Sequence, residues 1–292
     1  HIPLRSLCRL FRDALKMPLW TTFPHPKYPT LKLLLARLNT IYAVTTMVKD
    51  TKKISNYNQQ DNDKLVKIIY LDKGLIEVED EEDVLLITYP LTLIGAGRNQ
   101  TIISGGYGFH IQAKKERNKK VQFLNMTICH TCSVGILADG AQEPRSIGFM
   151  RHIPHPTNGL SFLCENVTIT KCGSGISAIF TAGRLINCIV TQCGENGIRC
   201  REHSIIEVEG SLTKVDGNCR AGNRWDYGLL TGRSAVYTDY PLSIIRLLEP
   251  LTKESVSTNN GGGGNYGGVK DRDANEDGIH EEAGLIETVL CF

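Results

Sequence analysis

The sequence has little surplus charge of either sign and no long apolar run. Its 33 Lys and Arg residues nearly balance its 31 Asp and Glu residues, for a net charge of +2, and no basic cluster resembles a nucleic-acid-binding face. The apolar run from Leu33 to Leu35 is soon followed by Arg37 and Asn39, whereas a membrane span needs about 20 apolar residues. We therefore expect neither nucleic acid nor a membrane as a partner.

The strongest positive signal is an internal repeat. Three segments align, each with an Asn, an alternating β-branched run, a Cys and a Gly followed by Ile: NMTICHTCSVGI (125–136), NVTITKCGSGI (166–176) and NCIVTQCGENGI (187–198). GSLTKVDGN (210–218) is a weaker copy. Ile169, Val190 and Leu212 follow one another at 21 and 22 positions, and Ile128 precedes Ile169 by 41 positions, which is one period plus an inserted loop at 141–158.

A repeat of short strands and Gly or Asn turns cannot bury its apolar face alone, so the units must stack. Stacked coils would enclose a continuous core, and parallel pairing between neighbouring coils would satisfy their backbones. We therefore predict an all-β fold, a right-handed parallel β-helix or solenoid. A leucine-rich repeat has a similar period, but its characteristic Leu spacing is absent.

Two kinds of side chain recur at fixed places in the repeat. The asparagines are predicted to bond the turn of the next coil, and the cysteines to fill the core as reduced thiols. The predicted structural ladder comprises Asn125, Asn166, Asn187, Cys132, Cys172 and Cys193. Two of these asparagines lie in glycosylation sequons, but the repeat places them inside turns without room for a glycan. Together with the reduced thiols, this predicts an intracellular location, cytoplasmic or nuclear. The residues before Pro18 agree, because arginines interrupt any secretory signal there.

The segment ahead of the repeat carries a family resemblance. KIIYLDKGLIEVEDEEDVLLI (67–87) predicts strand, turn, strand, acidic loop and strand. LTLIGAG (91–97) and TIISG (101–105) follow it. This order, continued by the Asn and Gly-Ile coils, resembles the pectate-lyase-like right-handed β-helix proteins over residues 65 to 250. The resemblance implies a groove along one flank of the stack as the place where ligands bind.

The two ends of the chain differ from the repeat. Residues 30–46 have a helical apolar stripe and Thr30 as an N-cap, so we predict a helix that caps a β-helix domain spanning 30–250. Residues 251–292 are Gly-rich and then acidic, which is typical of a flexible tail.

Residues 1–28 are predicted to form an amphipathic helical segment. Within them, LRSLCRLFRDAL (4–15) places its apolar residues on one helix face. This stretch is similar to the last helix of an F-box. The resemblance implies attachment to a ubiquitin-ligase scaffold, with the β-helix selecting substrates, while a helix packed on the β-helix is the plain structural alternative.

The acids of the repeat region do not recur at equivalent points of successive coils. They include Glu165, Glu195, Glu207, Glu209 and Asp216, whereas polysaccharide enzymes of the resembled fold need clustered carboxylates. We therefore expect no catalytic residues and predict a non-catalytic module that binds a protein or glycan partner. The alternative is a polysaccharide lyase or glycoside hydrolase, which rests on fold resemblance alone.

A few other residues are candidates for contact or for metal binding. His152 and His155 lie in the inserted loop, and Trp225 and Tyr227 follow the fourth coil; we predict all four as partner contacts, with capping as the alternative for the aromatic pair. The CHTC motif at 129–132 lacks a second pair of zinc ligands, and DANEDG (273–278) matches only half of a calcium loop. No cofactor or metal is expected.

Overall fold

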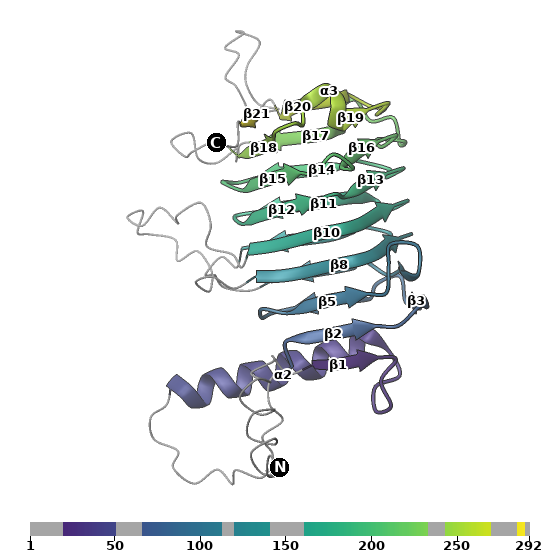
Figure 1. Cartoon of the computed structure of the whole chain (residues 1–292), viewed down its shortest axis with the longest axis vertical. Helices are drawn as coiled ribbons and strands as arrows, with labels where there is room; N and C mark the ends of the chain where they lie inside the picture. Colours follow the sequence, from purple (N-terminus) through teal and green to yellow (C-terminus); the bar gives the residue numbers. More distant parts are fainter. Residues whose placement is uncertain are drawn as a thin grey trace, which may run out of the picture.

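The computed structural model describes residues 20–50, 66–112, 120–140, 161–232, 243–269 and 285–289. The protein is mostly β, and its strands form two long sheets (Figure 1). Predicted segments 4–15 and 141–158, with His152 and His155, lie outside the described residues.

Within the described residues the larger sheet has fourteen strands. Its main path is β1 (Trp20–Phe23), β2 (Ile68–Leu71), β5 (Thr92–Gly95), β8 (Lys120–Cys129), β10 (Ser161–Thr170), β12 (Ala182–Ile186), β15 (Ile205–Glu209), β18 (Ile244–Leu248) and β21 (Leu285–Val289). Beside this path lie β3 (Gly74–Val78), β6 (Thr101–Gly105), β13 (Ile189–Thr191), β16 (Lys214–Asp216) and β19 (Ser257–Thr258). The chain thus adds strands to one end of the sheet as it proceeds.

The smaller sheet has seven described strands. In chain order they are β4 (Val84–Ile87), β7 (Gly108–Ile111), β9 (Val134–Asp139), β11 (Ser174–Ile179), β14 (Ile198–Arg201), β17 (Tyr227–Gly232) and β20 (Gly264–Val269). The chain alternates between the two sheets, and the neighbouring strands of both sheets pair in parallel. This arrangement is compatible with the predicted solenoid. We call one passage through both sheets a rung.

Like residues of successive rungs stack in the core. Ile128 pairs with Ile169, which pairs with Val190, as the repeat predicts. Val190 then pairs with Val215, not with the predicted Leu212, which is 58% exposed. The prediction was wrong here because Leu212 lies in a turn closed by a hydrogen bond from the Thr213 N–H to the Gly210 carbonyl.

The predicted alignment of the cysteines is wrong at one position. Cys172 and Cys193 are buried, but Cys132 is exposed. The His130 N–H bonds the Thr170 carbonyl as the Lys171 N–H bonds the Thr191 carbonyl, so Thr131 is the residue equivalent to Cys172. Cys132 comes one position too late because it follows Asn125 by seven positions, whereas Cys172 follows Asn166 by six.

The predicted asparagines mark a repeated bend in the strands. Asn125, Asn166 and Asn187 have φ values of 58°, 53° and 51°, which Asn tolerates better than most residues. The Asn166 amide donates to Asn125 Oδ1 at 3.3 Å. The Asn187 carboxamide oxygen instead accepts a long bond of 3.4 Å from the Leu212 N–H.

A second asparagine ladder, which the repeat did not predict, continues the cysteine column. Asn218 accepts from the Cys193 N–H at 3.0 Å and donates to the Val190 carbonyl at 3.0 Å. Its own N–H donates to Asn260 at 2.9 Å. Asn218 is 1% exposed, so the buried core column changes from thiols to amides along the stack.

A helix covers the start of the stack. α2 (Leu31–Asp50) begins after Thr30, whose hydroxyl accepts from the Leu33 N–H at 3.2 Å. Leu34, Leu35 and Leu38 are buried in the core. The predicted capping helix is present and extends to Asp50, whereas residues 20–23 form strand β1 and not part of a helical segment.

The Gly-rich residues after 250 continue the stack and are not a tail. They form α3 (Lys253–Val256) and strands β19 and β20, and β21 pairs with β18. A Cβ added at Gly267 would lie 2.4 Å from the Tyr227 ring. Glycine therefore permits close packing of the last described rungs here, so low complexity did not indicate flexibility.

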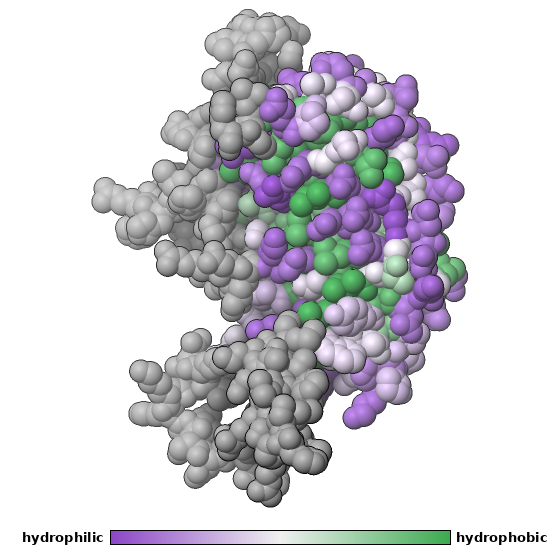
Figure 2. Space-filling model, in the orientation of Figure 1, coloured by the Kyte–Doolittle hydropathy of each residue, from purple (hydrophilic) through white to green (hydrophobic). Residues whose placement is uncertain are grey.

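The outer surface mixes polar and apolar side chains. On the side drawn in Figure 2, a band of hydrophobic residues is interrupted and bordered by hydrophilic ones. Among the described helices, none is both long and apolar enough to cross a membrane.

We predict that Asn218→Ala lowers the free energy of unfolding by about 2–4 kcal/mol, because the buried Cys193 N–H and Val190 carbonyl lose their partners. Asn187→Ala is the matched control and should cost about 1 kcal/mol, since it removes one long bond and adds backbone strain. Urea denaturation checks both values. A larger loss for Asn187→Ala would contradict the assigned ladder.

Candidate functional site

The outer face of the seven-stranded sheet gathers charged side chains on neighbouring strands. His110 is in register with Leu137, then Ser177 and Arg199, and the next outward row runs from Asp139 through Ile179 to Arg201. The alternate residues on the same strands, including Ile136, Ile176 and Ile198, are buried in the core. We call the outward set of His110, Asp139, Ser177, Arg199 and Arg201 the polar flank.

Each of the two arginines, Arg199 and Arg201, has a shielded Nε atom that lacks an acceptor among the described residues. Burial lowers the pKa of the Arg199 guanidinium, and the nearby charge of Arg201 lowers it further. Burial likewise lowers the pKa of Arg201, against the opposing effect of Glu202 and Asp139. An acceptor from outside would satisfy these donors.

Asp139 and His110 influence each other across the flank. Burial raises the pKa of Asp139, while the charges of His110 and Arg201 oppose that rise. Burial lowers the pKa of His110 from 6.5, and Asp139 opposes it. His110 is therefore mainly neutral at pH 7, and its Nε2 atom is buried without a partner among the described residues.

Two further carboxylates lie where the chain enters the sheet. Glu195 accepts a hydrogen bond of 2.8 Å from the Ser174 hydroxyl, and Asp226 accepts one of 3.1 Å from the Asn196 amide. Burial raises the pKa of Asp226; the charge of Glu195 raises it further, and that of Arg199 opposes the rise. We call Glu195 and Asp226 the carboxylate corner.

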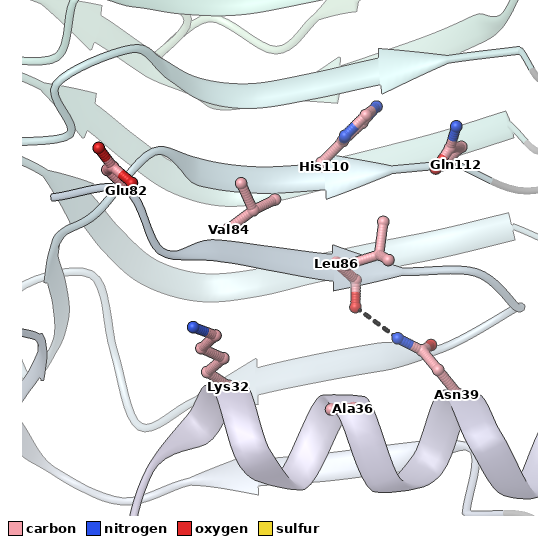
Figure 3. Close-up of a pocket in the computed structure, with 8 residues that line it drawn as sticks. All are labelled: Lys32, Ala36, Asn39, Glu82, Val84, Leu86, His110 and Gln112. Atoms are coloured by element: carbon pink, nitrogen blue, oxygen red, sulfur yellow. Dashed lines mark hydrogen bonds between the residues drawn. The ribbon is translucent and has the colours of Figure 1, made fainter. Parts of the chain in front are cut away.

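A pocket of about 510 Å³ lies between α2 and the first strands of the same sheet. Figure 3 shows three of its residues on the helix, with the others on or beside β4 and β7. The Asn39 amide nitrogen donates to the Leu86 carbonyl at 2.9 Å. Lys32 pairs with Asp83. The lining residues are Lys32, Ala36, Asn39, Glu82, Val84, Leu86, His110 and Gln112.

The predicted partner contacts are only partly described. Trp225 is 40% exposed, with the Arg224 guanidinium 4.7 Å from its ring centroid. Tyr227 packs against Gly263 and Gly267. Both aromatic residues flank Asp226 in the sequence, so the described part of the predicted contact set lies at the carboxylate corner.

The polar flank was not predicted from the sequence. Its signal was present in IRCR (198–201), where arginines alternate with core residues, and in GFHI (108–111). The alternation places these polar residues outward only once the strands are known to stack. Nothing in the sequence alone brings His110 and Arg199 onto one face.

Among the described residues, no three His, Cys, Asp or Glu side chains are grouped to hold a metal ion. Comparison with known protein families, with curated proteins and with solved structures finds no match for this chain.

We predict that His110 makes stability depend on pH. The pKa of His110 in the folded protein is below 6.5. As the pH falls through 6.5, the unfolded chain therefore binds more protons than the folded chain does. The contribution to stability that is present above this pH is lost below it. The thermal midpoint should therefore fall less on acidification in His110→Gln than in the unmodified protein. His130→Gln is the control, because an exposed corner with equivalent φ already holds Gln192 in another rung. Equal acid sensitivity of the His110 variant and the unmodified protein would contradict the prediction.

Proposed function

We propose that the chain is a right-handed parallel β-helix that acts as a non-catalytic binding module. Right-handedness is supported by the general rule for crossovers between parallel strands. The polar flank is the surface that contacts a protein or glycan partner. The observation that carries this proposal is the pair of arginines on β14 whose shielded Nε atoms have no acceptor in the part of the chain that the structure describes.

The chemistry of the arginine pair favours an external acceptor. Buried donors without partners are costly, whereas a guanidinium presents a rigid fork that matches carboxylates and other oxyanions. Arg199 and Arg201 are separated by one residue on the same strand and face the same side. A partner carboxylate could therefore reach both of them.

A finer proposal concerns the cellular role. Residues 4–15 resemble the end of an F-box, and this segment lies outside the described residues. On that basis we propose the module as a substrate-recognition subunit of a ubiquitin ligase. Recovery of ligase components together with a flank-bound substrate would support this role.

The binding surface can be tested with paired variants in a pull-down of the intact chain. Arg199→Gln with Arg201→Gln should weaken capture of the main partner about tenfold or more, because it removes charged donors from a shielded surface. Arg184→Gln with Arg246→Gln is the matched control on the larger sheet, where these arginines bond Glu209 at 2.6 Å and Glu287 at 2.7 Å. Unchanged capture by the flank variant would overturn the proposal.

One observation favours a second candidate, an enzyme acting on polysaccharide. At the carboxylate corner, burial and a neighbouring carboxylate raise the pKa of Asp226, which is how a general acid is held protonated. If this candidate is right, the protein cleaves an acidic or neutral polysaccharide and Asp226→Asn slows cleavage at least about a hundredfold. A polysaccharide panel assayed for reducing ends and for unsaturated products tests it, and lack of cleavage of the panel by the unmodified protein counts against it.

A further inference from the structure

The pocket beside α2 contains polar groups that can accept hydrogen bonds. Lys32 is engaged by Asp83, and the Asn39 carboxamide is engaged by the Leu86 carbonyl and by Thr88. Among the residues that the structure describes, the groups that remain are the Glu82 carboxylate, the Gln112 amide and the His110 Nε2 atom, which has no partner there. A carboxylate and an amide oxygen accept hydrogen bonds, and so does the Nε2 atom of an imidazole whose proton is on Nδ1.

The charge around the pocket is negative. Five consecutive acidic residues, 79–83, form the turn between β3 and β4. Four of them are exposed, and Asp83 is the one paired with Lys32. Glu82 is the exposed acid that also lines the pocket. The acidic run therefore attracts a cation toward the pocket.

The walls of the pocket are apolar. Ala36 projects from the helix, and Val84 and Leu86 project from β4, facing the same hollow (Figure 3). A volume of about 510 Å³ is larger than a single ion requires. The ligand that fits apolar walls and acceptor groups together has an aliphatic stem and a cationic head.

We propose that this pocket binds an arginine side chain from a basic segment of a partner protein. The aliphatic stem lies against Ala36, Val84 and Leu86. The guanidinium donates to the Glu82 carboxylate, with the acceptors of Gln112 and His110 available to its remaining N–H groups. Arginine suits the site better than lysine because its planar head has five donors to distribute among separate acceptors.

This inference rests on the proposed binding function and makes it more specific. His110 belongs both to the pocket and to the polar flank, so the two adjoin at this residue. The surface is acidic at the α2 end, beside β4, and carries the arginine pair on β14, three strands beyond β7 in the same sheet. A bound segment would therefore place a basic residue near α2 and an acidic residue near Arg199.

The direct test uses the intact chain and short, dye-labelled Gly-Ser peptides that contain arginine, lysine or citrulline at the same positions. Fluorescence anisotropy should show the arginine peptide binding at least about tenfold more tightly than the citrulline peptide, which keeps the shape but loses the charge. The lysine peptide should fall between them. Equal affinity for the arginine and citrulline peptides would overturn the proposal.

Two pocket variants and one control locate the binding. Glu82→Gln should lower the affinity for the arginine peptide about fivefold to tenfold, because it removes the carboxylate that accepts from the guanidinium. Ala36→Leu should lower this affinity as strongly, because the larger side chain fills the pocket. Since Ala36 is exposed, the thermal midpoint of unfolding should not change. Glu79→Gln removes an equal charge from the same acidic run outside the pocket and should change affinity less than about twofold.

The outcomes separate the pocket from the general binding function. Equal weakening by Glu79→Gln and Glu82→Gln, with no effect of Ala36→Leu, would show diffuse attraction and refute the pocket. If these variants leave peptide affinity unchanged while the Arg199 and Arg201 double variant still loses its partner, the pocket inference fails and the flank function stands. If that double variant retains its partner while the pocket variants lose the peptide, the flank proposal fails alone.

Discussion

Parallel hydrogen bonding between rungs is the constraint on which the rest of this structure depends. Each strand has its partners one rung before and one rung after it, so a residue's neighbours in space are its equivalents in the repeat. The chain from Ile128 to Ile169, Val190 and Val215 follows this rule. A side chain that fits the core at one level must therefore fit beneath and above similar side chains.

The same constraint produces the candidate site. Once one set of alternate residues is committed to the core, the other set is aligned on the outer face without further cost in backbone geometry. Arg199 and Arg201 are placed on one surface with Asp139 and His110 because the alternate residues of their strand, Ile198 and Cys200, are buried in the core. The outer rows can vary in chemistry while the inner rows remain apolar.

The repeat predicted the mostly β fold and the pairing of Ile128, Ile169 and Val190, because these positions depend on local spacing. It failed where rungs change length. Cys132 was aligned by residue type, although counting from Asn125 leads to Thr131. Leu212 was chosen by assuming a constant period, which the turn after Gly210 interrupts. The Asn218–Asn260 ladder was missed because its two members lie in rungs of different length.

The candidate site was less predictable for a different physical reason. Its residues come from several rungs, and whether each faces outward depends on the phase of every strand, which the sequence shows only where apolar alternation is clear. The pocket is lined by residues of a helix and of the sheet, and no spacing rule relates Ala36 to His110. Trp225 and Tyr227 drew notice as rare aromatic residues, yet Tyr227 packs on glycines of the next rung.

The unequal number of residues per rung also bears on how such a protein can be modified. Ile128 and Ile169 are direct neighbours although 41 positions separate them, while Ile169 and Val190 are neighbours at 21. The described strands keep their register despite this difference, so the extra length lies in the connections between them. A connection between strands is therefore a suitable insertion site. A reporter domain or a foreign epitope could be inserted there while the strands on either side keep their pairing.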